Sequence, residues 1–506
     1  MNIAQLFLEA ARKYPTHTAL IEGTRQVTYA TLEKEVQQTA DYFRSKGLQP
    51  GDRVLVFIPM GIDLYRTVLA IFHAGLVAVF VDQWVNLSRL KVCCKLADCQ
   101  GFVGSNKARW LKALIPALRK IPISLRTKVN AARDQNLPAA SASAPIRPYN
   151  VKPDNTALIT FTTGSTGTPK AADRTHAFLH EQFKSLIRVI NPKPTDVDYT
   201  NLPILPLLNL ATGGATVLEN PKGSEDRLRK KLHRILKTHP LTRITASPAL
   251  LLLIAQQVLQ QQTPTDALTK LFTGGAPVYP ADAQRIQQAF PQASFKAVYG
   301  STEVEPISTL AMQDLLNTNV WAEQGLLVGV LAAQTDIHIM DLNASLPHET
   351  SEQEIDRWSL EEGQIGEIMV AGPHVLKRYF KNREAFRANK LVTATETWHR
   401  TGDSGFLKEG QLYLTGRCKD LIRKGDAWIS PFVVESLLKE LENVTAGTIM
   451  QQGEELVLVI EGKASEEDLT WLRKSIQYDR VVRMKQIPRD PRHRSKIDYE
   501  GLEKKL

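Results

Sequence analysis

The stretch Thr162-Thr-Gly-Ser-Thr-Gly-Thr-Pro-Lys170 follows directly on an apolar run, Ala157-Leu-Ile-Thr-Phe161. The run is typical of a buried strand. The nine residues after it contain two glycines, five hydroxyl side chains and a terminal lysine. Glycine lets backbone N–H groups approach a ligand closely, hydroxyls donate hydrogen bonds, and lysine supplies positive charge. A strand that ends in such a loop predicts a polyphosphate site.

The spacing differs from that of the common P-loop, which has four residues between its first glycine and a Gly-Lys pair. Here two residues separate Gly164 from Gly167, and Lys170 comes three residues later. Clusters of Ser, Thr and Gly are often no more than flexible surface loops. The agreement of strand, glycine spacing and closing Pro-Lys favours a site instead. The stretch resembles the phosphate loop of the AMP-forming adenylating enzymes: acyl-CoA synthetases, adenylation domains of peptide synthetases, and luciferases.

Composition narrows the class of protein. A chain of 506 residues predicts two or more domains. Its 43% hydrophobic and 23% charged residues are ordinary for a globular protein. No apolar run reaches the roughly 18–20 residues that span a bilayer, and the amphipathic N-terminus is unlike a signal peptide. The four cysteines form neither a metal-binding pattern nor a disulfide framework, which favours a reducing cytoplasm.

The net charge of +10 favours an anionic ligand or an acidic partner. Basic residues gather at 227–243 and at 483–505. Both groups have the composition of solvated helix faces, so we expect no nucleic-acid partner.

The order of the predicted elements indicates an α/β fold. Residues 51–59 and 76–82 read as strands on either side of a helix, and a strand, helix and strand in about 30 residues predict parallel pairing. A second α/β region contains predicted strands at 243–246, 271–277 and 295–299, with helices at 176–190, 225–238 and 248–262. After residue 325 the pattern changes to short strands separated by glycine turns, as in a small β-barrel. Residues 341–363 are acidic and polar and predict an exposed loop.

We therefore predict two domains. The first is a large N-terminal adenylate-forming domain, with α/β subdomains at 1–150 and 151–325 and a β-barrel at 326–417. The second is a small mobile α+β lid at 418–506.

The segment Tyr299-Gly-Ser-Thr-Glu303 ends a predicted strand, and open α/β sheets bind ligands outside the carboxyl ends of their strands. An aromatic ring there can stack on a base, a hydroxyl can bond a phosphate, and a carboxylate can hold Mg²⁺. The resemblance places adenine against Tyr299 and Gly300, the α-phosphate at Thr302, and the metal at Glu303. For Glu303 the simpler alternative is an exposed carboxylate at a strand end.

Other motifs follow the family's order. Gly274-Gly275-Ala276 is a turn of the kind that presents backbone to adenine, although Gly-Gly turns are common. The resemblance places Asp403, in Trp398-His-Arg-Thr-Gly-Asp403, on the ribose hydroxyls and Arg417 on the ribose or phosphates. A surface Asp–Arg pair of little energetic value is the alternative.

Two positions in the predicted lid complete the set. The resemblance makes Lys419 the hinge about which the lid turns, a role that needs only tolerant backbone torsions. It also makes Lys496 the lysine that reaches the carboxylate and the α-phosphate. The local sequence, Arg492-His-Arg-Ser-Lys496, differs from the motif that is commoner in the family. The residues predicted to bind ATP are Thr162, Thr163, Gly164, Ser165, Thr166, Gly167, Lys170, Gly274, Gly275, Ala276, Tyr299, Gly300, Asp403 and Arg417, and those predicted to be catalytic are Thr302, Glu303 and Lys496.

The resemblance implies an enzyme that uses ATP and Mg²⁺ to activate a carboxylic acid, such as a fatty acid, as an acyl adenylate. Transfer to CoA or to the thiol of an acidic acyl carrier protein would follow. Members that make acyl-CoA commonly carry a His or aromatic gate where this chain has Leu208-Asn209, which weakens the expectation of CoA transfer.

Residues 202–213, 299–308 and 492–497 resemble one branch of the family, the β-lactone synthetases of bacterial olefin synthesis. Those enzymes close a ring with the substrate's own 3-hydroxyl and use no thiol. A third hypothesis is a non-catalytic nucleotide-binding protein of the same fold. The presence of Lys170, Glu303, Asp403 and Lys496 argues against it.

Overall fold

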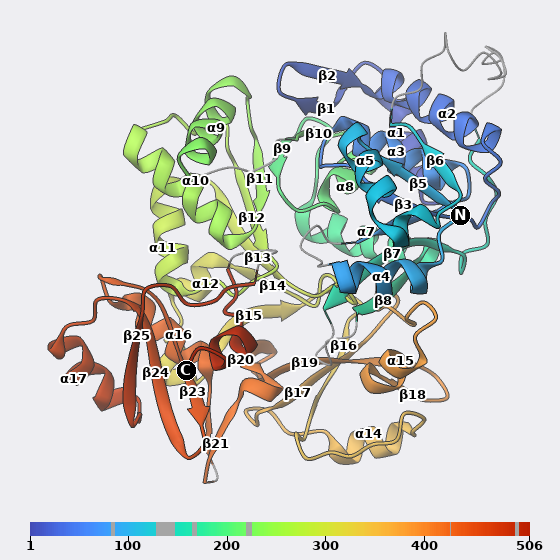
Figure 1. The fold of residues 1–506 in the computed structure, drawn as a ribbon. Helices are drawn as coiled ribbons and strands as arrows, with labels where there is room; N and C mark the ends of the chain where they lie inside the picture. Colours follow the sequence, from blue (N-terminus) through green and yellow to red (C-terminus); the bar gives the residue numbers. More distant parts are fainter. Residues whose placement is uncertain (82–86, 128–146, 164–168, 219–224, 426, 491–494) are drawn as a thin grey trace.

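The computed structural model describes residues 1–81, 87–127, 147–163, 169–218, 225–425, 427–490 and 495–506 (Figure 1). Most of the chain forms two large mixed sheets with their helices, and the C-terminal part adds a smaller sheet of its own. This arrangement confirms the predicted α/β fold class, with a large N-terminal part and a smaller α+β C-terminal part. In the described ranges, no helix is both long and apolar enough to cross a membrane.

The first sheet contains six strands in the order β6-β5-β3-β4-β7-β8. All neighbours are parallel except β7 and β8, which form an antiparallel hairpin. The predicted strand–helix–strand unit is β3, α3 and β4. The elements are α2 (Tyr29–Ser45), β3 (Arg53–Phe57), α3 (Ile62–His73), β4 (Val77–Phe80), α4 (Leu87–Ala97), β5 (Gly101–Gly104), α5 (Asn106–Leu114), α6 (Pro116–Arg119), β6 (Ile123–Leu125), β7 (Thr156–Thr163) and β8 (Pro169–Thr175).

The second sheet begins with the antiparallel pair of β2 and β1 and continues as a parallel stack, β10, β9, β11, β12 and β13. The helices predicted at 176–190, 225–238 and 248–262 are α7, α9 and α10. The elements are α1 (Ala4–Lys13), β1 (Thr18–Glu22), β2 (Arg25–Thr28), α7 (His176–Ile190), β9 (Val197–Thr200), α8 (Leu205–Thr212), β10 (Ala215–Val217), α9 (Glu225–Thr238), β11 (Arg243–Ala246), α10 (Pro248–Gln261), β12 (Lys270–Gly274), α11 (Pro280–Ala289) and β13 (Ser294–Tyr299).

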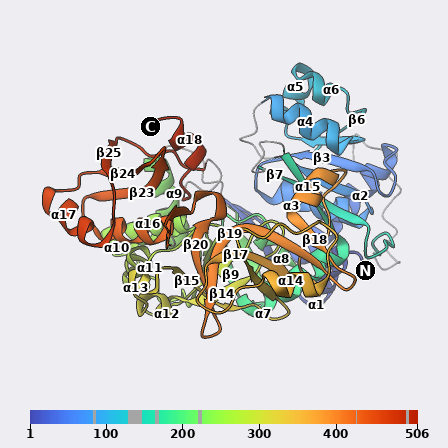
Figure 2. The ribbon, with the colours of Figure 1, turned by 90° about the horizontal axis from the view of Figure 1, so that it is seen from below.

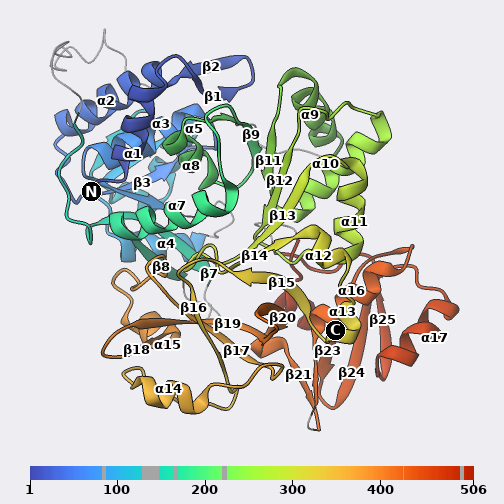
Figure 3. The ribbon, with the colours of Figure 1, turned by 180° about the vertical axis from the view of Figure 1, so that it is seen from behind.

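Antiparallel strands extend this sheet beyond β13, in the order β14-β15-β20-β19-β17-β16, with β18 paired to β19. Figure 3 shows them below the two parallel stacks, with α14 and α15 beside them. The elements are β14 (Ser308–Ala311), α12 (Met312–Leu316), α13 (Val320–Glu323), β15 (Leu326–Leu331), β16 (Asp336–Met340), α14 (Glu352–Trp358), β17 (Gly366–Ala371), α15 (Arg383–Asn389), β18 (Lys390–Val392), β19 (Thr397–Lys408) and β20 (Gln411–Arg417).

The acidic segment 341–363 is not entirely loop, as its composition predicted, because it contains α14. The Ser351 hydroxyl accepts a hydrogen bond from the Glu354 N–H and caps the helix. Ile355 is the residue of this helix that is fully buried. With so few apolar residues, the segment gives no helical periodicity for sequence analysis to detect.

The C-terminal part folds around a three-stranded sheet at the end of the molecule opposite α5 and α6 (Figure 2). Helix α16 joins two cores: Val433 packs among large-domain residues, and Leu438 packs among C-terminal ones. The elements are a 3₁₀ helix (Cys418–Asp420), β21 (Ile422–Lys424), β22 (Ala427–Ile429), α16 (Pro431–Glu440), β23 (Val444–Gln452), β24 (Glu455–Gly462), α17 (Glu466–Ser475), β25 (Arg480–Met484) and α18 (Tyr499–Glu503).

Candidate active site

Tyr299, Asp403 and Arg417 form one cluster at the carboxyl end of β13. The Tyr299 hydroxyl donates to Asp403 Oδ2 at 2.7 Å, and Arg417 Nε lies 3.1 Å from Asp403 Oδ1. Asp403 and Arg417 are register partners in the β19–β20 pair. Burial, followed by the neighbouring Asp403 carboxylate, raises the pKa of Tyr299, so the phenol stays protonated and remains a donor.

Glu303 lies in a second cluster and is 9% exposed, which excludes an exposed strand-end carboxylate. Its Oε1 accepts a 2.9 Å hydrogen bond from the Tyr379 hydroxyl, and its Oε2 accepts one of 3.3 Å from Ser301. Burial by itself would raise the pKa of Glu303. His399, Lys390, the Tyr379 hydrogen bond and Lys170 together hold the pKa below its ordinary value. The site therefore favours an ionised carboxylate.

Lys170 lies close enough to Glu303 for the two side chains to shift each other's pKa. Its Nζ donates to Asn389 Oδ1 at 2.7 Å, at the end of α15. Burial lowers the pKa of Lys170, and Glu303 opposes that shift. Thr162 pairs with Lys170 in the β7–β8 ladder, and Thr163 is the last residue of β7. The remaining loop predictions, Gly164, Ser165, Thr166 and Gly167, lie outside the described residues.

Lys390 and His399 were not predicted from the sequence, yet they lie beside Glu303. Lys390 is fully buried in β18, and its Nζ has no hydrogen-bond partner among the described residues. It lies 5.9 Å from the centre of the Tyr379 ring. Burial lowers the pKa of Lys390 to about 7 and that of His399 to about 3. The sequence feature that could have pointed to Lys390 is a lysine at the start of an apolar strand. Lysine is almost never fully buried without a partner, so such a position is unusual.

The glycines of the predicted adenine site lie at the same sheet edge, because β12 and β13 are parallel. A Cβ on Gly274 would lie 2.8 Å from the Val298 carbonyl oxygen, and one on Gly300 would lie 2.8 Å from that of Val304. Gly275 has φ +87°, so the turn into Ala276 also favours glycine. The Thr302 carbonyl accepts a 3.1 Å hydrogen bond from Arg174 Nη2, which fixes the backbone before Glu303.

Lys419 and the segment that carries Lys496 are joined. Lys419 Nζ lies 2.9 Å from Glu500 Oε1, four residues after Lys496. Ser495 Oγ accepts a 3.3 Å hydrogen bond from the Ala249 N–H at the start of α10. Helix α10 follows β11, whose carboxyl end lies at the same edge as that of β13. The predicted lysine is therefore carried to the edge that holds Tyr299.

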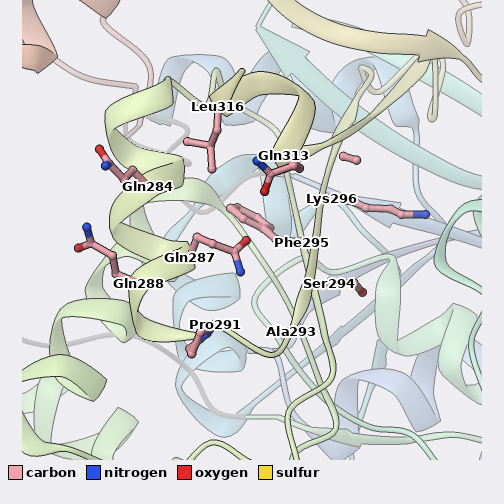
Figure 4. Close-up of a pocket in the computed structure, with 11 residues that line it drawn as sticks. Gln284, Gln287, Gln288, Pro291, Ala293, Ser294, Phe295, Lys296, Gln313 and Leu316 are labelled. Atoms are coloured by element: carbon pink, nitrogen blue, oxygen red, sulfur yellow. The ribbon is translucent and has the colours of Figure 1, made fainter. Parts of the chain in front are cut away.

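A surface hollow of about 650 Å³ lies elsewhere, between α11, β13 and α12 (Figure 4). Gln284, Gln287 and Gln313 supply amides to its lining, and Lys296 supplies a cation. None of the predicted site residues that the structure describes lines this hollow.

The metal prediction rests on Glu303. No group of three or more His, Cys, Asp and Glu suited to a metal occurs in the ranges that the structure describes. Mg²⁺ usually takes one or two carboxylates together with substrate phosphates and waters. A single ionised Glu303 near Lys170 is compatible with that pattern.

Comparison with known proteins decides the family. The sequence profile described as AMP-binding enzyme matches residues 7–380. The chain belongs to the AMP-binding enzyme family. It is thus an AMP-forming acid ligase, as the motif order predicted.

Individual AMP-binding enzymes are similar over most of their length. An olefin beta-lactone synthetase of Stenotrophomonas maltophilia is 25% identical over 543 aligned residues, covering 99% of this chain and 97% of the relative. One of Xanthomonas campestris pv. campestris is 28% identical over 448 residues, covering 82% and 78%. A feruloyl-CoA synthase of Amycolatopsis sp is 27% identical over 486 residues, covering 92% and 90%.

Solved structures show the same fold. An amide bond synthetase, McbA from Marinactinospora thermotolerans, gives a TM-score of 0.83 at 21% identity, covering 99% of this AMP-binding enzyme and 98% of the other chain. ATP-bound MatB from Rhodopseudomonas palustris gives a TM-score of 0.80 at 21% identity, covering 100% of this chain and 99% of the other.

The gate positions proposed for acyl-CoA formation prove to be interior. Leu208 and Asn209 are both fully buried in α8. Asn209 Nδ2 donates to Asp198 Oδ2 and to Thr216 Oγ1, each at 2.9 Å, and Asn209 Oδ1 accepts from the buried Arg243 guanidinium. Asn209 thereby connects α8 to β9, β10 and β11, whereas Leu208 packs in a hydrophobic core. Neither side chain is exposed in this arrangement.

Proposed function

We propose that this AMP-binding enzyme transfers the AMP part of ATP to the carboxylate of a hydrophobic acid and releases pyrophosphate. The observation that carries the proposal is the meeting of two clusters at one sheet edge. Tyr299, Asp403 and Arg417 offer an aromatic ring, a carboxylate and a cation suited to a nucleoside. Glu303 and Lys170 offer groups of opposite charge suited to a metal and to phosphates.

Each group has a defined task in this proposal. Asp403 accepts hydrogen bonds from the ribose hydroxyls, and Tyr299 supports it while presenting its ring to adenine. Glu303 holds Mg²⁺, which when bound offsets the charge of the triphosphate. Lys170 binds the leaving phosphates, Thr302 bonds the α-phosphate, and Lys496 stabilises the charge that develops there. The acid's carboxylate oxygen attacks the α-phosphorus, and the bond to pyrophosphate breaks.

For the second step, similarity to the olefin beta-lactone synthetases favours ring closure on the substrate. The 3-hydroxyl oxygen attacks the acyl carbon, its proton passes to solvent, and AMP leaves with the shared oxygen. The alternative is attack by the thiol of CoA or of a carrier protein. Similarity to a feruloyl-CoA synthase supports that alternative.

One experiment tests both steps. The purified protein is given ATP, Mg²⁺ and either a long-chain 3-hydroxy acid or the matching acid without the hydroxyl, with and without CoA. We expect AMP and pyrophosphate from both acids, and a product lighter than the 3-hydroxy acid by one water that forms without CoA. ADP and orthophosphate would contradict the first step. A product that forms only with CoA would establish the thiol alternative.

A further inference from the structure

Glu435 joins three parts of the chain that are distant in sequence. Its Oε2 accepts a 2.5 Å hydrogen bond from the Tyr279 hydroxyl of the large domain. Its Oε1 accepts one of 2.5 Å from Tyr499, at the start of α18, and one of 3.2 Å from Thr448 in β23. Thr448 and Tyr499 are also bonded to each other, at 2.7 Å. A hydroxyl has one proton, so Thr448 donates either to Glu435 or to Tyr499, and the two tyrosines are the short donors to the carboxylate.

The carboxylate and its tyrosine donor are buried, so losing one of these hydrogen bonds would be costly. Glu435 is 8% exposed, and Tyr279 is 3% exposed. A buried carboxylate that loses a donor keeps its desolvation cost without compensation. The nearby Lys439 does not replace those donors, because it bonds Asp282 of the large domain at 2.9 Å. That ion pair and the Tyr279 bond cross the same interface between α11 and α16.

Both tyrosines that bond Glu435 lie close in sequence to predicted active-site residues. Tyr279 comes three residues after Ala276, in the segment that leads from the predicted adenine turn into α11. Tyr499 comes three residues after Lys496. The segment has other restraints within the C-terminal part: the Lys496 carbonyl accepts a 2.9 Å hydrogen bond from the Asp490 N–H, and Leu502 is fully buried. Ser495 accepts a bond of 3.3 Å from the large domain, and the Lys419–Glu500 pair is exposed on both sides. Through Tyr499 and Tyr279, Glu435 adds a buried side-chain connection between this segment and the large domain.

We propose that Glu435 is a positioning residue that ties the Lys496 segment to the start of α11 through Tyr499 and Tyr279. In this way it sets Lys496 for the adenylating step. The inference rests on the proposed role of Lys496. If so, the rate of adenylation depends on the Tyr279–Glu435 hydrogen bond, which joins the two domains and involves no reacting atom.

A double-mutant cycle with Tyr279→Phe and Lys496→Ala tests this coupling, with ATP–pyrophosphate exchange as the assay. Tyr279→Phe keeps the ring and removes only the hydroxyl that bonds Glu435. We expect kcat to fall about tenfold, the effect of one buried charge-assisted hydrogen bond, with the KM for ATP unchanged. In the Lys496→Ala background the same change should have no further effect on the residual rate, because the residue through which it acts is absent. Tyr499→Phe should behave in the same way.

Tyr29→Phe is the matched control. Its buried hydroxyl bonds the Asn209 and Gly214 carbonyls at 3.0 and 2.9 Å, within the large domain. It should lower the melting temperature and leave kcat unchanged. Independent, multiplying effects of Tyr279→Phe and Lys496→Ala would overturn the inference, as would an unchanged kcat in Tyr279→Phe. A wild-type protein that gives no exchange with any acid would instead reject the proposed function.

Discussion

Tyr299 and Asp403, 104 residues apart in sequence, share a 2.7 Å hydrogen bond at the carboxyl end of β13. The phenol donates and the carboxylate accepts, so the carboxylate is fixed on one side while Arg417 approaches its other oxygen at 3.1 Å. Under the proposed function, the two oxygens held in this way would be the acceptors for a pair of ribose hydroxyls.

Replacement of Asp403 by Ala should therefore weaken ATP binding. We expect the KM for ATP to rise about tenfold or more, because hydrogen bonds to a charged acceptor are lost. Exchange kinetics at varied ATP measure this, with Asp336→Ala, on the exposed start of β16, as control. An unchanged KM would show that Asp403 does not contact the nucleotide.

The Glu303 carboxylate should be required for its charge. Glu303→Gln keeps the shape but removes the negative charge that Mg²⁺ needs. Turnover should fall roughly 10²-fold or more, with little change in melting temperature. The comparison is made at limiting Mg²⁺, beside Glu409→Gln at an exposed turn. Equal rates for wild type and Glu303→Gln would contradict the metal assignment.

Lys496→Ala should reduce the rate of adenylation far more than it reduces ATP affinity. Its charge acts on the transition state, whereas the nucleoside groups belong to the large domain. We expect a loss of roughly 10²-fold or more, about 3 kcal/mol. Exchange rates and ATP titration separate the two quantities, and Lys474→Ala, at an exposed position in α17, is the control. A wild-type rate would move the role to Lys485 or Lys504.

Buried His73 should make folding sensitive to acid. It is 3% exposed, and neither ring nitrogen has a hydrogen-bond partner among the described residues. Burial lowers its pKa to about 4, from 6.5. Because the folded pKa is depressed, the unfolded chain binds the proton more readily below pH 6.5. The contribution of His73 to stability is therefore complete above pH 6.5 and is lost as the pH falls toward 4.

Urea denaturation at pH 7.5 and pH 5 measures this effect. The free energy of unfolding should fall by about 2 kcal/mol through His73 alone over that range. His73→Gln cannot take up the proton, so its fall should be smaller by that amount. Identical falls in both proteins would show that His73 does not carry the dependence.

Local pattern and motif order were enough to determine much of this protein. The run before Thr162, the strand–helix–strand around α3, and the glycines at 274 and 300 each reflect a physical need that is local in the chain: burial, crossover pairing or close backbone approach. For the same reason the sequence predicted the fold class and the family. Helix α14 was missed because it buries only Ile355 completely.

Other features were decided only by tertiary structure, because they depend on residues that meet from distant parts of the chain. Lys390 and His399 look unremarkable in sequence and become part of the site when β18 and β19 pair beside Tyr379 and Glu303. Glu435 reads as one more helical carboxylate until Tyr279 and Tyr499 close over it. Burial then controls the ionisation of these side chains, because a charge removed from water depends on the few groups that remain in contact with it.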